Sequence, residues 1–483
     1  MNRAHTWLDF SSARDLLARR EITAVELLEF MLERIEAQNP TLNAFVGVLR
    51  ESASEQARIA DRELAQGRSR GPLHGITLGV KDIIDVEGAT TRAGSRSLRN
   101  GPATRDAACV ARLRKAGAIV MGKLHTHELA AGITSDNAVF GRARNPWSIA
   151  HIPGGSSGGS AIATAAGLVH CAIGTDTGGS IRIPAAFCGV VGLKGTLGRV
   201  SRHGVLGRSS TMDHVGPIAR RVRDAALIFE TMAGHDDADD HSSRRPVPSL
   251  VDALSGDLRG IHVGVLTGAF FESDVDRQIA DSFENALAAI TAAGAQLRSV
   301  SFEPAEAAHA AGYLIAFAEA ASLQQDALRE RPQDFGADVR AQLQAAGFIS
   351  AAQYISALRV RTRIQRALGQ LLTEVEVLLL PTVPILPPRC DEPPSTNQSL
   401  LCARNTRLFS VAGVPAVTVP AGFSREGLPM GLQIVGRPFD EATMLRVADA
   451  YERATQWYTR TPTDAIPNPD STVTTTLHAS PTA

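Results

Sequence analysis

Short apolar segments alternate with amphipathic segments along most of this chain, and that alternation constrains its fold more than any other feature. From Gly75 onward, strands are predicted at 75–80, 118–122, 168–174, 261–266, 296–300, 376–380, 415–419 and 430–435. Helices are predicted at 107–116, 158–167, 275–293 and 440–456, and over most of 305–370. Alternation of this kind predicts an α/β fold, with a single large α/β/α layered domain around a mixed, largely parallel twisted sheet.

The two ends of the chain differ from this region. Thr23 and Glu26 have the spacing of a capping box, and the apolar face that follows indicates a helix that ends at Asn39-Pro40. The last residues include few bulky apolar side chains, which is typical of a flexible tail. We therefore expect an N-terminal helical segment packed on the core, the α/β domain and a flexible tail, at 1–65, 66–464 and 465–483.

Composition and charge exclude several classes of partner. The 483 residues include 49 basic and 50 acidic ones, and this balance predicts no nucleic-acid partner and no binding to an anionic membrane. No apolar run approaches the ~18 residues of a spanning helix, and the start lacks the pattern of a secretion signal. The five cysteines are odd in number and widely spaced, so we expect no disulfide framework and a reducing, cytoplasmic location.

Lysine is rare in this chain. The lysines are Lys81, Lys115, Lys123 and Lys194, and all other basic residues are arginine. A general drift towards arginine explains most of this bias, but not which lysines remain. A buried lysine can lose its proton and an arginine cannot, so a position that needs a neutral amine base must keep lysine. Lys81 has apolar residues on both sides and is the candidate base, whereas Lys115 and Lys123 are expected at the surface or in loops.

Two clusters rich in glycine and serine, PGGSSGGS at 153–160 and GTDTGGSIRIP at 174–184, are the main candidates for a site. The first matches the GxSxG elbow of α/β-hydrolases or a phosphate-binding helix start, but a proline rather than a strand precedes it. Together the clusters favour an oxyanion hole, because consecutive glycines let backbone N–H groups converge on one point. His125 and His127 have the spacing of metal ligands, but no further cluster completes a site, so no metal is predicted.

Three segments carry a family resemblance. They are GVKD at 79–82, PGGSSGGSA at 153–161 and GTDTGGSIRIPAAFCGVVGLK at 174–194. Each piece alone is a weak signal, but their combination and spacing closely resemble the amidase signature family over about 65–460. The resemblance implies amide hydrolysis without a cofactor.

The same resemblance assigns catalytic roles. It implies a Ser–cis-Ser–Lys triad with Lys81 as the base, Ser156 as a bridging serine in a cis peptide and Ser180 as the nucleophile. The residue types fit this chemistry, since a neutral amine can take the nucleophile's proton through a hydroxyl that donates and accepts at once. The oxyanion hole is expected from the N–H groups of Thr177, Gly178, Gly179 and Ser180. Hydrogen bonds and a charge pair that support the two loops are expected from Ser157, Asp176 and Arg182.

These features predict an amidase that converts a carboxylic amide to an acid and ammonia or an amine through an acyl-Ser180 intermediate. Two alternatives keep the triad: the glutaminase (A) subunit of a tRNA-dependent amidotransferase, and an ester or carbamate hydrolase. That subunit usually carries glutamine directly after the arginine of GSIR, where this chain has Ile183, which counts against it. A non-catalytic scaffold protein would require a broken triad, and all three positions are intact.

The expected partner is a small-molecule amide, and a homodimer stays open. The apolar stretch HAAGYLIAFAEAASL, within 305–370, favours an uncharged acyl group, although the same residues would equally pack a core.

Overall fold

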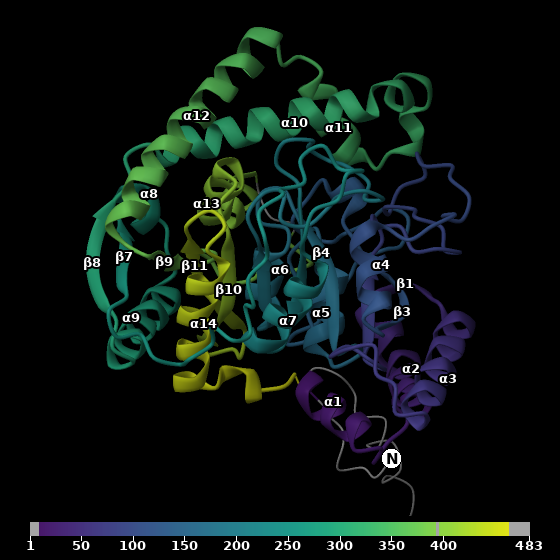
Figure 1. Cartoon of the computed structure of the whole chain (residues 1–483). Helices are drawn as coiled ribbons and strands as arrows, with labels where there is room; N and C mark the ends of the chain where they lie inside the picture. Colours follow the sequence, from purple (N-terminus) through teal and green to yellow (C-terminus); the bar gives the residue numbers. More distant parts are fainter. Residues whose placement is uncertain (1–8, 393–395, 463–483) are drawn as a thin grey trace, which may run out of the picture.

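The structure, a computed structural model, describes residues 9–392 and 396–462, and its centre is one 11-stranded mixed sheet (Figure 1). The strands lie in the order β1-β3-β2-β4-β6-β5-β10-β11-β9-β7-β8. Their bounds are β1 Phe45–Val48, β2 Thr77–Lys81, β3 Ile119–Leu124, β4 Cys171–Asp176, β5 Val191–Lys194, β6 His214–Ala219, β7 His262–Thr267, β8 Gln296–Ser301, β9 Val377–Pro381, β10 Ala416–Phe423 and β11 Pro429–Gly436. The predicted α/β class and mixed sheet are confirmed, and the predicted tail at 465–483 lies outside the described residues.

Parallel pairing is confined to two groups of strands and does not dominate the sheet. β3, β2 and β4 run parallel to one another, and so do β9, β7 and β8. Every pair between β4 and β9 is antiparallel. The connections explain the difference, because parallel neighbours need a crossover, whereas β10 and β11 are joined by a short turn. The expected largely parallel pairing therefore holds only for these two groups.

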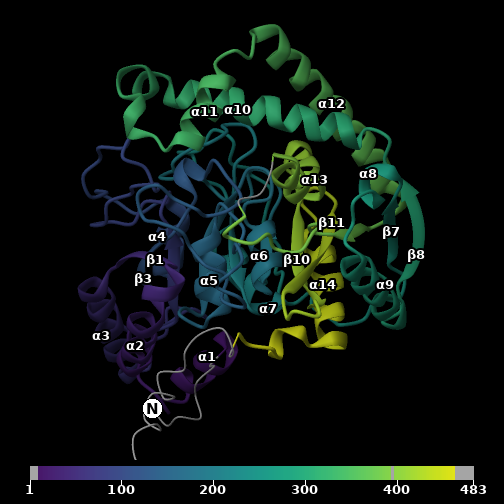
Figure 2. The same cartoon turned by 180° about the vertical axis from the view of Figure 1, so that it is seen from behind.

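Helices surround the sheet (Figures 1 and 2). Their bounds are α1 Phe10–Ala18, α2 Ala24–Leu42, α3 Arg50–Ala65, α4 Ala108–Lys115, α5 Gly158–Ala165, α6 Arg182–Cys188, α7 Val222–Met232, α8 Ala269–Glu272, α9 Arg277–Ala292, α10 Ala305–Glu330, α11 Ala337–Ala346, α12 Ala351–Glu374, α13 Thr396–Ala412 and α14 Glu441–Thr455. Helices α2 and α3 lie at the β1 end of the sheet, and α9 lies at the end formed by β7 and β8.

The N-terminal segment is continuous with the sheet. Thr23 and Glu26 form the predicted capping box at the start of α2. The helix passes Pro40 and ends at Leu42, because Asn43 adopts a left-handed conformation with φ of 51°. The next residues form β1, which pairs antiparallel with β3 and extends the sheet at its edge.

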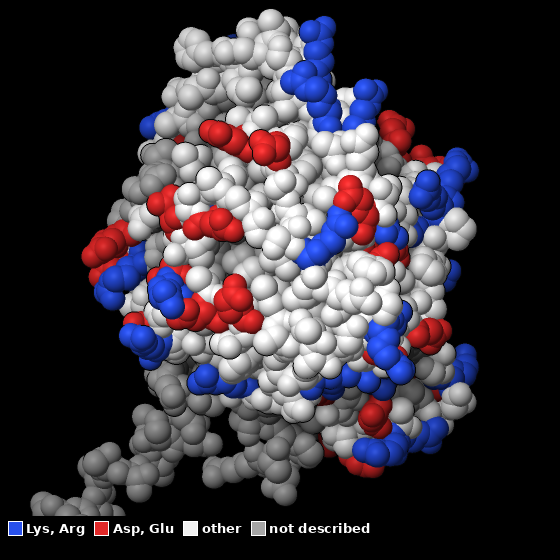
Figure 3. Space-filling model, turned by 90° about the vertical axis from the view of Figure 1, so that its left-hand side faces the viewer, with Lys and Arg blue, Asp and Glu red and all other residues white. Residues whose placement is uncertain are grey.

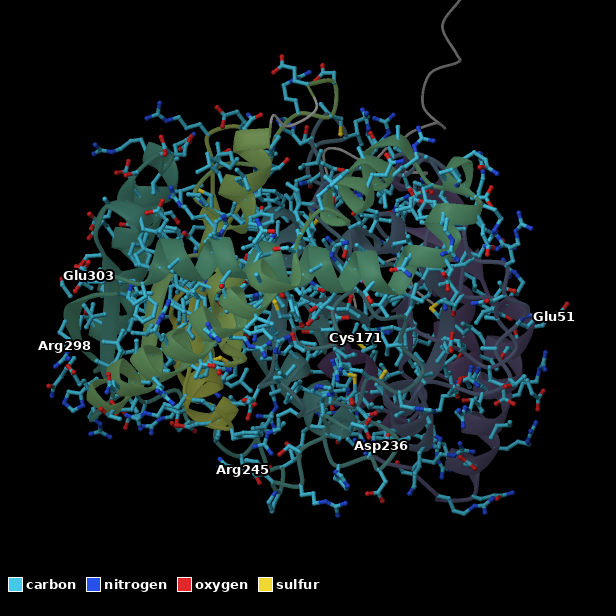
Figure 4. All side chains as sticks on the ribbon, turned by 90° about the horizontal axis from the view of Figure 1, so that it is seen from above. Glu51, Cys171, Asp236, Arg245, Arg298 and Glu303 are labelled. Carbon is cyan, nitrogen blue, oxygen red and sulfur yellow. The ribbon has the colours of Figure 1, made fainter. Side chains whose placement is uncertain are left out.

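Helices α10, α11 and α12 form an arch over one end of the sheet strands (Figures 1 and 4). Helix α10 packs against α11, α12 and α13. Its Ala311 and Ile315 belong to a buried apolar cluster with Met212 and Val411. In Figure 4, which looks down on the arch, Glu51 and Arg298 mark opposite ends of the molecule. The arch supplies one wall of the cavity described below.

The surface carries both signs of charge. Figure 3 shows acidic and basic side chains interspersed over one face, in keeping with the formal net charge of -1. Within 9–392 and 396–462, no helix combines the length and the apolar character needed to cross a bilayer. All five cysteines are free and buried.

Candidate active site

Lys81 stands at the end of β2 and is fully buried. Its Nζ lies 2.7 Å from Ser156 Oγ and 2.8 Å from Thr175 Oγ1, which is hydrogen-bond distance to both hydroxyls. Burial lowers the pKa of Lys81 to about 7, although the charges of Asp213 and Asp176 act in the opposite direction. The geometry therefore offers a buried amine that is neutral in a large share of molecules near neutral pH.

The bridging serine lies in the loop that leads into α5. The Gly155–Ser156 peptide bond is cis, as the family resemblance implies, and the Ser156 side chain is buried. The next residue fastens this loop to β4, since Ser157 Oγ donates to Thr175 O at 3.1 Å and accepts from Thr175 N–H at 3.2 Å. The Ser157 N–H also donates to Ser180 O at 3.2 Å. The two glycine-serine clusters are thus held directly against each other.

Ser180 lies in the turn between β4 and α6 and is partly exposed. It lines a cavity of about 930 Å³ together with residues of the α10 and α11 arch, including Tyr313 and Gln342. The predicted nucleophile therefore lines the cavity, whereas the predicted base is fully buried and does not line it. This separation suits a buried proton acceptor that serves an accessible hydroxyl.

Asp176 and Arg182 form a buried two-point ion pair beneath the turn. Arg182 donates through Nε and Nη2 to the two carboxylate oxygens, each at 2.9 Å, and both side chains are fully buried. Burial alone would raise the pKa of Asp176, but the Arg182 guanidinium outweighs it and holds that pKa well below its usual range. Arg182 also donates to Thr406 O at 2.9 Å and to Gln433 Oε1 at 2.7 Å. The pair therefore ties the turn to α13 and β11.

The same carboxylate shapes the expected oxyanion hole. Asp176 Oδ1 accepts from Gly179 N–H at 2.7 Å, so this amide is already engaged. Gly179 has φ of 135°, a conformation that side chains rarely adopt and that favours glycine at this position. Thr406 Oγ1 fixes the turn from α13 by donating to Gly178 O at 2.7 Å. The candidate donors are accordingly Thr177, Gly178 and Ser180, without Gly179.

Sequence reasoning missed two residues around the site. Thr175 contacts the lysine amine, and Asp213 accepts from Thr177 Oγ1 at 2.6 Å. Burial raises the pKa of Asp213, and hydrogen bonds from Thr177 and the backbone oppose that rise. Thr175 lies inside the quoted motif, but its residue type alone does not reveal which way its side chain faces.

The expectation that Lys123 lies at the surface or in a loop is wrong. Lys123 is buried on β3, where its Nζ donates to Thr91 Oγ1 at 2.9 Å and to the carbonyl of Ile84, and lies 3.4 Å from Asp82. Lys194 is buried as well, and Lys115 is exposed. Three of the four retained lysines are therefore buried, so retention and burial together do not single out the base, and only the contacts distinguish Lys81.

The two histidines considered as metal ligands have protein partners. His125 Nε2 lies 2.9 Å from Gly141 O, and His127 Nε2 lies 3.2 Å from Asp338 Oδ2. In the described part of the chain, no group of three or more His, Cys, Asp or Glu residues is arranged to hold a metal ion.

Comparison with known proteins agrees with the fold and the motifs. Residues 26–445 match the Amidase family. The A subunit of the glutamyl-tRNA(Gln) amidotransferase of Chloroflexus aggregans is 40% identical, over 94% of this chain and 98% of its own length. The corresponding protein of Moorella thermoacetica is 39% identical, over 93% of this chain and 96% of the relative.

Solved structures of similar fold include amidase signature enzymes. A vestigial protein complex connected with the origins of an s-triazine catabolic enzyme superposes with a TM-score of 0.89 at 33% identity, over 93% of this chain and 99% of the other. A bacterial aryl acylamidase superposes with a TM-score of 0.87 at 28% identity, over 94% and 98%. The chain belongs to the amidase signature family. It is a hydrolase of that family and acts on C–N bonds.

Proposed function

We propose that the chain hydrolyses carboxylic amides to an acid and ammonia or an amine through an acyl-Ser180 intermediate. One observation carries the proposal: the buried Lys81 amine contacts Ser156, whose loop is bonded to the turn that presents Ser180 to the cavity. The pKa of about 7 at Lys81, lowered by burial, supports its use as a base.

The first step forms the acyl-enzyme. The neutral Lys81 Nζ accepts the Ser156 proton, and Ser156 Oγ accepts the proton of Ser180 as Ser180 Oγ bonds to the amide carbonyl carbon. The carbonyl oxygen becomes an oxyanion, held by backbone amides of the 177–180 turn. Each such donor contributes about 3–4 kcal/mol to transition-state stabilisation in comparable enzymes.

The second half returns the proton and restores the enzyme. The Lys81 ammonium gives its proton back through Ser156 to the leaving nitrogen, and the C–N bond breaks. A water molecule then attacks the acyl carbon, with the same relay taking its proton, and the acid leaves as Ser180 regains its hydrogen. No cofactor enters these steps.

A glutaminase (A) subunit of a tRNA-dependent amidotransferase is the second candidate. The 40% identity to relatives of that name favours it. Against it stands Ile183, a buried apolar residue of the cavity wall at the position where that subunit usually has glutamine.

Ester or carbamate hydrolysis would use the same relay, because acyl-enzyme formation does not depend on a nitrogen leaving group. A cytoplasmic location stays the expectation from the sequence.

The test is an amide panel assayed with hydroxylamine. Primary, aryl and alkyl amides are incubated with the isolated chain, and hydroxamate formation reports an acyl-enzyme and identifies the acyl group.

Ser180→Ala and Lys81→Ala should each lose nearly all turnover, and wild-type turnover in either variant contradicts the proposal. Ser160→Ala is the matched control, since this serine of the same cluster donates to Ile173 O and contacts no lysine. Activity only in the presence of partner subunits would favour the amidotransferase candidate.

A further inference from the structure

We propose that Arg407 and Arg208 form a binding site for a carboxylate group of the substrate, so that the chain prefers amides carrying a negative charge close to the scissile carbonyl. The inference rests on the proposed amide hydrolysis and names the substrate class for that site. It replaces the expectation of an uncharged acyl group, which considered only the apolar residues of α10.

Arg407 is a buried cation on the cavity wall. It lies on α13, is 9% exposed and lines the same cavity as Ser180. Its Nε has no hydrogen-bond partner, and within 9–392 and 396–462 the guanidinium lies in no ion pair. A buried charge without a partner is costly, so such a group is expected to meet an anion when the site is filled.

The surrounding residues make room for this side chain. A Cβ on Gly312 of α10 would stand 2.8 Å from Arg407 Cγ, so the arginine stem runs where only glycine leaves space. The guanidinium then stacks over Tyr313, with Cζ 3.6 Å from the ring centroid. Stacking orients the planar fork but satisfies none of its N–H donors.

Arg407 also lies next to the reaction centre. Its Nη1 is 3.0 Å from the point where a Cβ on Gly178 would stand. Gly178 belongs to the 177–180 turn proposed to hold the oxyanion. An anion bound by Arg407 would thus be separated by only a few substrate atoms from the carbonyl that Ser180 attacks.

Arg208 supplies a second cation. It lines the same cavity, and its Cζ lies 5.6 Å from the ring centroid of Phe317. Burial, together with the nearby positive charge of Arg407, lowers the pKa of Arg208 to about 10. The two cations repel each other, the charge of Asp213 offsets part of this repulsion at Arg208, and a bound anion would offset more of it.

The carboxylate of Asp213, close to Arg208, is already engaged by other donors. Asp213 Oδ2 accepts from the backbone N–H groups of Arg208 and Ser209 at 2.8 and 2.9 Å, and Oδ1 accepts from Thr177. These bonds hold the 208–213 loop and leave the guanidinium donors free for a ligand. A carboxylate matches the planar donor fork of arginine.

The first experiment compares charged and uncharged substrates of equal size. Succinamate, which carries its carboxylate on the acyl side, is paired with succinamide. N-acetylglycine, which carries its carboxylate on the amine side, is paired with N-isobutylacetamide. We expect kcat/KM to favour one charged member by about 10- to 100-fold, as for a lost charge-assisted hydrogen bond. The favoured pair identifies the side of the amide that faces Arg407, and equal or weaker turnover of both charged members overturns the proposal.

Variants on one helix provide the matched comparison. Arg407→Gln should remove most of the preference for the charged substrate, and Arg407→Lys should restore part of it. Arg404→Gln is the control, because Arg404 lies one turn earlier on α13 and does not line the cavity. Its Nη1 lies 3.9 Å from Asp274 Oδ2. An unchanged preference in Arg407→Gln, or an equal loss in Arg404→Gln, contradicts the site.

A binding measurement separates this proposal from the proposed function. Titration calorimetry with succinate on the wild-type chain should detect binding that Arg407→Gln weakens by about 10-fold or more. If no amide forms hydroxamate but succinate binds through Arg407, amide hydrolysis fails and the carboxylate site stands. If uncharged amides are hydrolysed and succinate does not bind, the carboxylate site fails alone.

Discussion

Lys81 Nζ lies 2.8 Å from Thr175 Oγ1 while it also contacts Ser156. A neutral amine can donate to one hydroxyl and accept from the other, whereas an ammonium group can only donate. Thr175 therefore leaves the amine lone pair available to Ser156 and orients it as the proposed relay requires.

The pH dependence should report this amine. Because the base must be neutral and burial lowers the pKa of Lys81 to about 7, kcat/KM should rise with pH up to that value and level off above it. The measurement is a pH–rate profile with an uncharged amide, so that substrate ionisation does not contribute. A flat profile from about pH 5.5 to 8 would show that the rate depends on no such base.

Replacing Thr175 tests its role as a positioning residue. Thr175→Val keeps the shape of the side chain but removes the hydroxyl that orients the amine, and kcat should fall by about 10- to 100-fold. The KM should change little, because Thr175 contacts the lysine rather than the cavity that holds substrate. Thr175→Ser should recover most of the rate. A raised KM with kcat intact would contradict the assignment.

The buried Asp176–Arg182 pair should be important for stability. Asp176→Asn leaves the fully buried Arg182 without its counter-charge, and the free energy of unfolding should fall by about 3–5 kcal/mol in urea denaturation. The control is Asp281→Asn, which breaks the exposed pair with Arg277 and should cost about 0.5 kcal/mol or less. Similar losses in the two variants would refute the distinction.

Much of this architecture is readable from the sequence, and the failures have physical causes. The strands β2, β3, β4, β7, β9, β10 and β11 are predictable because apolar residues dominate their segments, whereas β8 is predicted although it includes Gln296, Arg298 and Ser299. Helix α13 is not predictable, since it buries polar residues, among them Thr406 and Ser410, whose side chains contact the turn and ion pair of the site. Tertiary hydrogen bonds to Gly178 and Arg182 compensate those groups, and they have no signature in a local pattern.

Some residues of the site are predictable from the sequence and others are not. The positions of Lys81, Ser156 and Ser180 follow from motifs with fixed spacing, although their roles stay predictions until the variants are measured. Arg407 could not be predicted in this way, because the sequence alone does not distinguish it from the many other arginines of the chain. Only the fold shows that it lies next to Gly178.

Stability should also depend on pH through a second buried carboxyl. Burial, with the nearby charge of Asp9, raises the pKa of Asp224 to about 7, and one of its oxygens has no partner. The folded state then holds a proton that the unfolded chain releases near its ordinary pKa of 3.8, so stability falls as pH rises from about 4 to 7.

Asp224→Asn cannot ionise, so its stability relative to wild type should improve by on the order of 2 kcal/mol between pH 5 and pH 8. Urea unfolding at both pH values measures this, with Asp281→Asn again as the surface control. An equal pH dependence in wild type and Asp224→Asn would rule out ionisation at this position.

The proposed relay and its supporting ion pair come from residues 81–182, whereas Tyr313, Phe317 and Arg407 reach the cavity from α10 and α13, far later in the chain. The residues proposed for bond breaking therefore lie in a different stretch of the sequence from the aromatic and arginine side chains that α10 and α13 contribute to the cavity. Substitutions at Tyr313, Phe317 or Arg407 would accordingly alter which substrates bind while leaving the residues of the proposed relay unchanged.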